Sequence, residues 1–459
     1  MNQVVYATTM WDPDGPGPQP ARIVAGGNFT SAGGIAANRV AAWNPATGTW
    51  SALGSGMDNY VLSLAVMPNG DLIAGGGFST AGGVNARSIA RWNGSAWSPL
   101  GGVAQVINGD VYALTVLPGG GLVAGGTFQF AGFTLVNRVA IWDGANWSPM
   151  SIGMNDAVLA TTLLASGELV AGGYFTTAGG SAVNYLAKWN GAAWSPLGAG
   201  IDSFVFALAT RANGDLVVAG QFQSAGGAAA NRIASWNPAG GGSWSPLGAG
   251  MNLNVRAVTE LTSGDLVAGG EFTTAGGAPA NFIARWNGTT WSPVGAGMDT
   301  RVRALTALPS GDFVAGGNFT TAGGTPAQFF ARSCAGASWT AFGSGCAGPG
   351  GVPALTLVSP PQLGSTFTLA VNNLGGGLRL MVVGLSPTSL PLLSLGFGPG
   401  CTLLATPDLL EVLVAVGSTS SWSLAIPNVP ALAGIHLWNQ AAELGTASAI
   451  SNGGEGVIG

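Results

Sequence analysis

Three aspartates that share one position of an internal repeat are the residues of this chain best suited to acid–base or metal chemistry. Asp58, Asp202 and Asp299 end the Gly-rich segments GSGMD, GAGID and GAGMD, and Arg301 follows the third of them. Two carboxylates at a defined separation could act as general acid and base on a glycosidic bond. Aspartate together with backbone carbonyls could also bind calcium. Asp in such loops equally caps turns through hydrogen bonds to the backbone, so both interpretations stay open.

Other catalytic and metal chemistry has little support in the residue types. The chain has one histidine, His436, which argues against a three-His zinc site or a Ser-His-Asp triad in the repeats. We therefore expect no metal centre apart from the calcium alternative, and no other cofactor. The three cysteines allow one disulfide in three pairings. We predict a bond between Cys346 and Cys401, with Cys334 left over.

The composition narrows the class of protein and its partners. Only 7% of residues are charged and 47% are hydrophobic, which predicts a large buried core. The few Lys and Arg residues are scattered and the net charge is -5, so nucleic acid is not an expected partner. No apolar run of about 18 residues is free of interruptions, which argues against insertion into a membrane.

The surface composition suggests a location outside the cell or on its surface. Ser, Thr, Asn and Gly dominate over charged residues, yet the first residues, MNQVVYATTMWDPDG, contain no basic segment followed by an apolar one. The sequence therefore favours an extracellular or cell-surface protein without a signal peptide in this chain. We expect it to be a monomer.

An eleven-residue string, VAGGNFTTAGG at 314–324, recurs with small changes along the first three quarters of the chain. Its phenylalanine occurs seven times, 47 to 50 residues apart, at Phe29, Phe78, Phe128, Phe175, Phe222, Phe272 and Phe319. A period near 50, with short apolar runs between Gly-rich turns, is typical of a propeller blade. Within the unit that begins at Val255, the runs VRAVTEL, DLVAGGEFT, FIARWNG and TWSPVG predict four antiparallel strands.

The repeat therefore predicts an all-β, seven-bladed β-propeller with four antiparallel strands per blade, over residues 1–346. The glycine pair of VAGG marks a place where a side chain would collide with a neighbour or where the strand bulges. Two tryptophans in most units are predicted to pack between blades. Each unit contains all four of its strands, so the ring is expected to close by side-chain packing between the first and last blades.

After Gly350 the period disappears. Short apolar runs such as ALTLV, TFTLAVNN and LRLMVVGL, separated by turn residues, predict a small β-sandwich over residues 347–459.

The unit pattern resembles a known family. A glycine pair, a Trp-Asn or Trp-Asp, a second Trp and a Met-Asp or Met-Asn step into the next unit are similar to the kelch type of β-propeller, although kelch repeats usually have Tyr at the first Trp. The whole chain, with its extension GSGCAGPGGVPALTL, resembles repeat proteins predicted to be secreted by bacteria. In such proteins, comparable C-terminal modules imply sorting or attachment.

The third unit departs from the others. Its QFAGFTLVN segment places Phe130 and Phe133 where other units are polar, so it could form an apolar contact site, or these groups could pack locally.

The sequence favours a non-catalytic binding or scaffold protein with a glycan or protein ligand. The residues proposed for the ligand are Asp58, Asp202, Asp299, Arg301, Phe130 and Phe133. Two alternatives remain: a carbohydrate-active enzyme that uses the aspartates in a central depression, and a structural tile of a surface layer.

Overall fold

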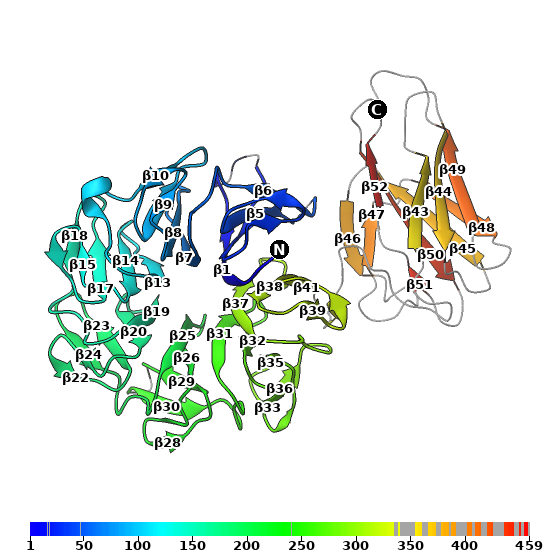
Figure 1. Ribbon diagram of the computed structural model, residues 1–459. Helices are drawn as coiled ribbons and strands as arrows, with labels where there is room; N and C mark the ends of the chain where they lie inside the picture. Colours follow the sequence, from blue (N-terminus) through cyan, green and yellow to red (C-terminus); the bar gives the residue numbers. More distant parts are fainter. Residues whose placement is uncertain are drawn as a thin grey trace. The chain divides into compact units, whose positions relative to one another are not determined.

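Figure 1 shows the computed structural model. It describes residues 1–339, without 16, 18, 46, 240 and 335–337, and beyond 339 it describes only the strands. The chain divides into two compact units, Met1–Trp339 and Thr340–Gly459. They are described separately. The boundary expected between 346 and 347 falls outside the described residues.

The first unit is a ring of seven four-stranded antiparallel sheets, which confirms the predicted seven-bladed β-propeller (Figure 1). In each sheet the first strand is innermost and contacts the first strands of the neighbouring blades, including β1 with β37. The first strands are β1 (Val5–Trp11), β7 (Val61–Val66), β13 (Val111–Val116), β19 (Val158–Leu163), β25 (Val205–Thr210), β31 (Val255–Glu260) and β37 (Val302–Ala307). The second strands are β2 (Arg22–Gly27), β8 (Leu72–Gly76), β14 (Leu122–Gly126), β20 (Leu169–Gly173), β26 (Leu216–Gly220), β32 (Leu266–Gly270) and β38 (Phe313–Gly317).

The outer half of each blade follows the same order. The third strands are β5 (Val40–Asn44), β11 (Ile89–Trp92), β17 (Val139–Trp142), β23 (Leu186–Trp189), β29 (Ile233–Asn237), β35 (Ile283–Trp286) and β41 (Phe330–Cys334). The fourth strands are β6 (Thr49–Ala52), β12 (Trp97–Pro99), β18 (Trp147–Pro149), β24 (Trp194–Pro196), β30 (Ser243–Pro246), β36 (Trp291–Pro293) and β42 (Ser338–Trp339).

Small hairpins join the second and third strands of every blade. They are β3 (Ser31–Ala32) with β4 (Ile35–Ala36), β9 (Thr80–Ala81) with β10 (Val84–Asn85), β15 (Phe130–Ala131) with β16 (Thr134–Leu135), β21 (Thr177–Ala178) with β22 (Ser181–Ala182), β27 (Ser224–Ala225) with β28 (Ala228–Ala229), β33 (Thr274–Ala275) with β34 (Ala278–Pro279), and β39 (Thr321–Ala322) with β40 (Thr325–Pro326). A short 3₁₀ helix, η1 (Val103–Gln105), lies in the connection from blade 2 to blade 3.

A β-bulge interrupts the pairing of the first two strands at the same place in all seven blades. In blade 1, Val5 pairs with Gly27 and Ala7 pairs with Gly26, so Tyr6 is the extra residue. A bulge re-aims the side chain of its extra residue. Each blade therefore has, at the bulge of its innermost strand, one residue that is not paired with the second strand, so the pairing does not fix the direction of its side chain.

The glycine pair makes room for the bulge and for the next blade. In blade 3 a Cβ on Gly126 would lie 1.9 Å from the carbonyl oxygen of Asp110, and one on Gly125 would lie 2.5 Å from Cγ1 of Val158 in blade 4. Both distances are too short for a real carbon atom, so the predicted steric role of the pair is confirmed. Blade 5 is the exception, because Ala219 replaces the first glycine of its pair.

Paired tryptophans pack the outer strands in six blades. Their ring centroids lie between 5.0 and 6.5 Å apart. The second indole also reaches the preceding connection: Trp97 donates to the Leu53 carbonyl at 2.7 Å, and Trp291 donates to the Leu247 carbonyl at 2.8 Å. These contacts confirm that the tryptophans hold neighbouring blades together.

Side chains close the ring between blades 1 and 7, as the sequence predicts. Phe330 packs on the tryptophan pair of blade 1, with its ring centroid 5.8 Å from that of Trp43 and 5.0 Å from that of Trp50. The hydroxyls of Thr8 and Thr306 lie 2.7 Å apart, and the Thr306 hydroxyl also donates to the Thr8 carbonyl at 2.9 Å. Every strand of both sheets comes from its own blade.

The second unit is described through its strands. β43 (Ala354–Ser359), β44 (Thr366–Asn372) and β49 (Ser420–Ala425) form one antiparallel sheet. A second sheet contains β48 (Leu409–Val414), β45 (Leu378–Gly384), β50 (His436–Leu444), β51 (Ala449–Ile450) and β52 (Gly454–Val457). β46 (Pro387–Pro391) pairs with β47 (Thr402–Ala405). The strands agree with an all-β unit, and their packing as a sandwich stays a prediction. Cys346 and Cys401, predicted to form a disulfide, lie outside the described residues.

Candidate functional site

The bulged residues of the seven blades meet at one mouth of the central channel. They line a cavity of about 420 Å³, which lies within the range of roughly 300–1,000 Å³ typical of small-molecule sites. In blade order they are Tyr6, Leu62, Tyr112, Leu159, Phe206, Arg256 and Arg303. Tyr60, Asp110 and Tyr174 complete the wall. Five of the bulged residues also line the channel below, so the cavity is the entrance of that channel.

This mouth is strongly enriched in aromatic hydroxyls. The chain has five tyrosines, and four of them line the cavity. The fifth, Tyr185, packs its ring 5.6 Å from Phe204, which in turn lies 4.5 Å from Tyr174. Below the mouth the channel is lined mainly by Ala, Thr and Leu. The cavity therefore differs in chemistry from the rest of the channel.

One side of the cavity is a carboxylate between two phenols. The hydroxyls of Tyr60 and Tyr112 donate to Oδ2 of Asp110 at 3.1 and 3.4 Å. Burial raises the pKa of Tyr112 to about 12, and the charge of Asp110 adds to this effect. Burial and Asp110 also raise the pKa of Tyr60. Both phenols therefore stay protonated at neutral pH and act as hydrogen-bond donors rather than nucleophiles.

The other side of the cavity carries guanidinium groups. Arg256 lies 3.9 Å above the ring of Phe206 and forms a salt bridge with Glu271 at 3.0 Å. Arg303 lies 5.3 Å from the ring centroid of Tyr6, and its Nε donates to Oδ1 of Asn318 at 2.6 Å. Such cation–π contacts keep a guanidinium against an aromatic wall. The terminal nitrogens of Arg303 stay available, whereas Nη2 of Arg256 is bound to Glu271.

The three predicted aspartates serve as turn caps in the structure. Oδ1 of Asp58 accepts the backbone N–H groups of Ser79 and Thr80 at 2.8 and 2.9 Å. Asp202 and Asp299 make the same two bonds within their own blades. In the other four blades an asparagine occupies this position, and its Oδ1 accepts the same two backbone N–H groups. These residues are Asn2, Asn108, Asn155 and Asn252. The described residues that line the mouth include none of the three aspartates.

The remaining predicted site residues lie in two places. Arg301 is not among the residues that line the cavity, and its Nη1 lies 3.7 Å from Oε1 of Glu271, the carboxylate bound by Arg256. Phe130 and Phe133 lie in and beside β15, away from the cavity lining, and their exposed fractions are 39% and 94%. Leu135, which pairs with Phe130, is also exposed. The local packing considered as an alternative therefore does not bury these groups.

Comparison of the seven units would have revealed the mouth residues. The residue after the invariant valine of the first strand is Tyr, Leu, Tyr, Leu, Phe, Arg and Arg in successive blades, whereas the valine itself never changes. Repeated residues maintain the repeated fold, so an asymmetric ligand site must lie at the positions that vary. This signal is present in the sequence, although the inward direction of the bulge is not.

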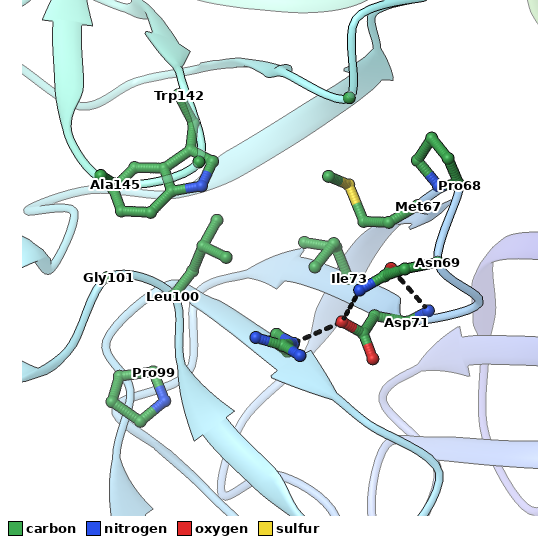
Figure 2. Close-up of a pocket in the computed structure, with 13 residues that line it drawn as sticks. Met67, Pro68, Asn69, Asp71, Ile73, Pro99, Leu100, Gly101, Trp142 and Ala145 are labelled. Atoms are coloured by element: carbon green, nitrogen blue, oxygen red, sulfur yellow. Dashed lines mark hydrogen bonds and ion pairs between the residues drawn. The ribbon is translucent and has the colours of Figure 1, made fainter.

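A larger cavity, of about 540 Å³, lies between blades 2 and 3 (Figure 2). Its polar groups already satisfy one another: Oδ2 of Asp71 lies 2.6 Å from both Arg91 and the Asn69 amide. The rest of its wall, including Leu100 and Trp142, is largely apolar. The irregular connection that contains η1 adjoins this cavity at Gly101. The smaller cavity at the mouth offers more groups for recognition and is the candidate site.

Two further searches cover only the described part of the chain. No three or more His, Cys, Asp or Glu side chains cluster there as a metal ion would need. No helix among those residues has the length and apolar character needed to cross a bilayer.

The comparisons with known proteins assign no family to the chain. No model of a protein family matches the chain, and no curated protein matches it. Among solved structures, the WD40 β-propeller domain of Doa1 is 14% identical, with a TM-score of 0.46, over 69% of this chain and 90% of that one. U3-55K is 12% identical, with a TM-score of 0.34, over 69% of this chain and 75% of its own. At these values neither likeness carries an argument about function.

Proposed function

We propose that the propeller is a non-catalytic binding module and that a glycan occupies the mouth of its channel. The observation that supports this most is the chemistry of the bulged position: tyrosine, phenylalanine and arginine surround a cavity of suitable size. The C–H bonds on the face of a sugar ring carry partial positive charge and stack on the negative face of an aromatic ring. Phenols and guanidinium groups then supply hydrogen bonds to its oxygen atoms.

The enzyme alternative has weaker support at this site. Acid–base catalysis of glycoside cleavage needs two carboxylates that flank the bond. At the mouth, Asp110 accepts from two tyrosines; Glu271, which does not line the cavity, is engaged by Arg256 and Arg301. The three repeat aspartates are bound to backbone N–H groups. Binding without catalysis explains this arrangement best.

The wider context is also part of the proposal. The blades keep their resemblance to the kelch type, and the low charge of the chain suits a monomer located outside the cell or on its surface. The C-terminal unit would then be a sandwich that serves sorting or attachment. A protein ligand in place of a glycan is the nearest alternative.

A glycan array probed with the full chain, with and without calcium, tests the binding function. We expect Tyr6→Ala and Phe206→Ala to reduce binding by roughly tenfold or more, which corresponds to about 1.4 kcal/mol. Asp202→Asn and Phe133→Ala are the controls and should bind as the unaltered protein does, since one retains the turn cap and the other lies outside the cavity. Unchanged thermal unfolding would show that the mouth variants remain folded.

The array can also contradict the proposal. Loss of binding only in Phe133→Ala would move the ligand to the third blade. Absence of any glycan binding would favour a protein ligand or a structural tile.

A further inference from the structure

We propose that the glycan bound at the mouth is acidic, and that Arg303 recognises the carboxylate of a uronic acid unit. This inference rests on the proposed function and specifies its ligand. It is carried by the distribution of charge around the cavity, by the free donors of Arg303 and by the acceptor that faces them across the ring.

Positive charge exceeds negative charge on one side of the mouth. Arg256 comes from blade 6, whereas Arg301 and Arg303 come from blade 7. Glu271 is their shared carboxylate, bound to Arg256 at 3.0 Å and 3.7 Å from Arg301. Three guanidinium groups with one carboxylate leave an excess of two positive charges on this side, and of one when Asp110 across the cavity is counted, in a chain whose net charge is -5. An anionic ligand would be attracted to this side of the cavity.

Of the three arginines, Arg303 is the one that forms no ion pair among the described residues, because Glu271 pairs with Arg256 and Arg301. Its Nε binds Asn318, and among the described residues its terminal nitrogens have no hydrogen-bond partner. The side chain is half-buried, and this burial lowers its pKa, to which the charges of Arg301 and Arg256 add. A desolvated guanidinium gains most from a carboxylate, whose two oxygens match its planar pair of donors.

The opposite side of the mouth requires a donor from the ligand. In a closed ring of seven blades, blade 3 lies across from the junction of blades 6 and 7, and Asp110 lines the same cavity as Arg256 and Arg303. Its Oδ2 accepts from Tyr60 and Tyr112, while its Oδ1 has no donor among the described residues. A sugar hydroxyl can supply that hydrogen bond. A pyranose with a carboxylate at one end and hydroxyls at the other fits both sides, with its ring against the aromatic wall.

Isothermal titration of the full chain with an oligogalacturonate and with its methyl ester tests the inference, because esterification neutralises the carboxylate and leaves the sugar ring and its hydroxyls unchanged. We expect the acid to bind about ten- to a hundredfold more tightly, the gain of a charge-assisted pair. In Arg303→Gln this preference should disappear while binding of the ester persists. Arg285→Gln, which removes an equal charge from a pair with Asp265 outside the cavity, should retain the preference.

Other outcomes separate the inference from the function on which it rests. Equal affinity for acid and ester in the unaltered protein, or a stronger preference for a sulfated sugar, would overturn the carboxylate assignment and leave glycan binding intact. Failure to bind acid, ester and neutral sugars alike would overturn both. A preference that survives in Arg303→Gln would exclude Arg303 as the recognising group.

Discussion

At the scale of the residue, the mouth depends on side chains that the repeat leaves free to vary. The bulge places one side chain per blade at the channel entrance, where burial and neighbouring charges alter its chemistry. Tyr112 is the clearest case, because its phenol is half-buried and bonded to Asp110. We therefore expect Tyr112 to have the highest pKa of the five tyrosines.

The ionisation of Tyr112 can be measured directly. Its pKa is raised from an ordinary 10.0 to about 12, so a component of the tyrosinate absorbance should appear only near pH 12. Tyr112→Phe should remove that component. Asp110→Asn should lower its pKa only in part, because burial is the larger cause. A native protein whose five tyrosines all titrate together near the ordinary value would contradict this arrangement.

The same shift has a consequence for stability. The folded state keeps the Tyr112 proton up to about pH 12, whereas the unfolded chain loses it near 10.0. The unfolded state therefore binds fewer protons between these values, and this contribution to the free energy of unfolding falls as the pH rises through that window. Below pH 10 the contribution is fully present, and Tyr112→Phe should flatten this part of the pH profile of stability.

Residue-level prediction from the sequence overlooked the residues that line the cavity. The aspartates attracted attention because they repeat, and the structure shows why they repeat: each accepts two backbone N–H groups, a task that Asn108 performs equally well in blade 3. The varying residues Tyr6 and Arg256 carried the asymmetric signal. Their meeting at one point depends on the bulge and on ring closure, which pattern alone does not specify.

At the scale of the element, the glycine pair sets how the first two strands of a blade meet. The second glycine lets the strand approach the backbone of the residue before the valine, and the bulge follows from this approach. The sequence predicted the steric reason for the pair. It could not say which glycine faces the backbone and which faces the neighbouring blade.

Substitution of the second glycine tests this account. Gly126→Ala would place a carbon 1.9 Å from the carbonyl oxygen of Asp110, so we expect a loss of about 1–3 kcal/mol in the free energy of unfolding, typical of overpacking. Gly119→Ala in the same blade is the control, since a Cβ there meets nothing within 4 Å. Its effect should stay within about 0.5 kcal/mol. Denaturant unfolding of both variants gives the comparison, and equal stabilities would refute a steric role for Gly126.

At the scale of the whole molecule, the seven-fold period was enough to predict the propeller, because each unit alone must bury its faces against two neighbours. The period also showed that no strand is exchanged between the ends. A connecting segment of the chain therefore joins the two blades at six of the junctions. No such segment joins blade 7 to blade 1. Thr8, Thr306 and Phe330 hold this seam.

The seam should be the place where the ring opens first. The Thr306–Thr8 hydroxyl pair at blades 7 and 1 has a counterpart in Thr115 and Thr161 at blades 3 and 4, also 2.7 Å apart. Thr161→Val should cost about 1 kcal/mol, the usual net value of one hydrogen bond, and Thr306→Val up to about 2 kcal/mol, because the Thr306 hydroxyl also donates to the Thr8 carbonyl. Amide hydrogen exchange should distinguish them, because only Thr306→Val weakens a junction that no connecting segment restrains. We expect faster exchange in β1 and β37 of Thr306→Val than in β13 and β19 of Thr161→Val, and equal exchange at both junctions would mean that packing closes the ring as firmly as a covalent connection does.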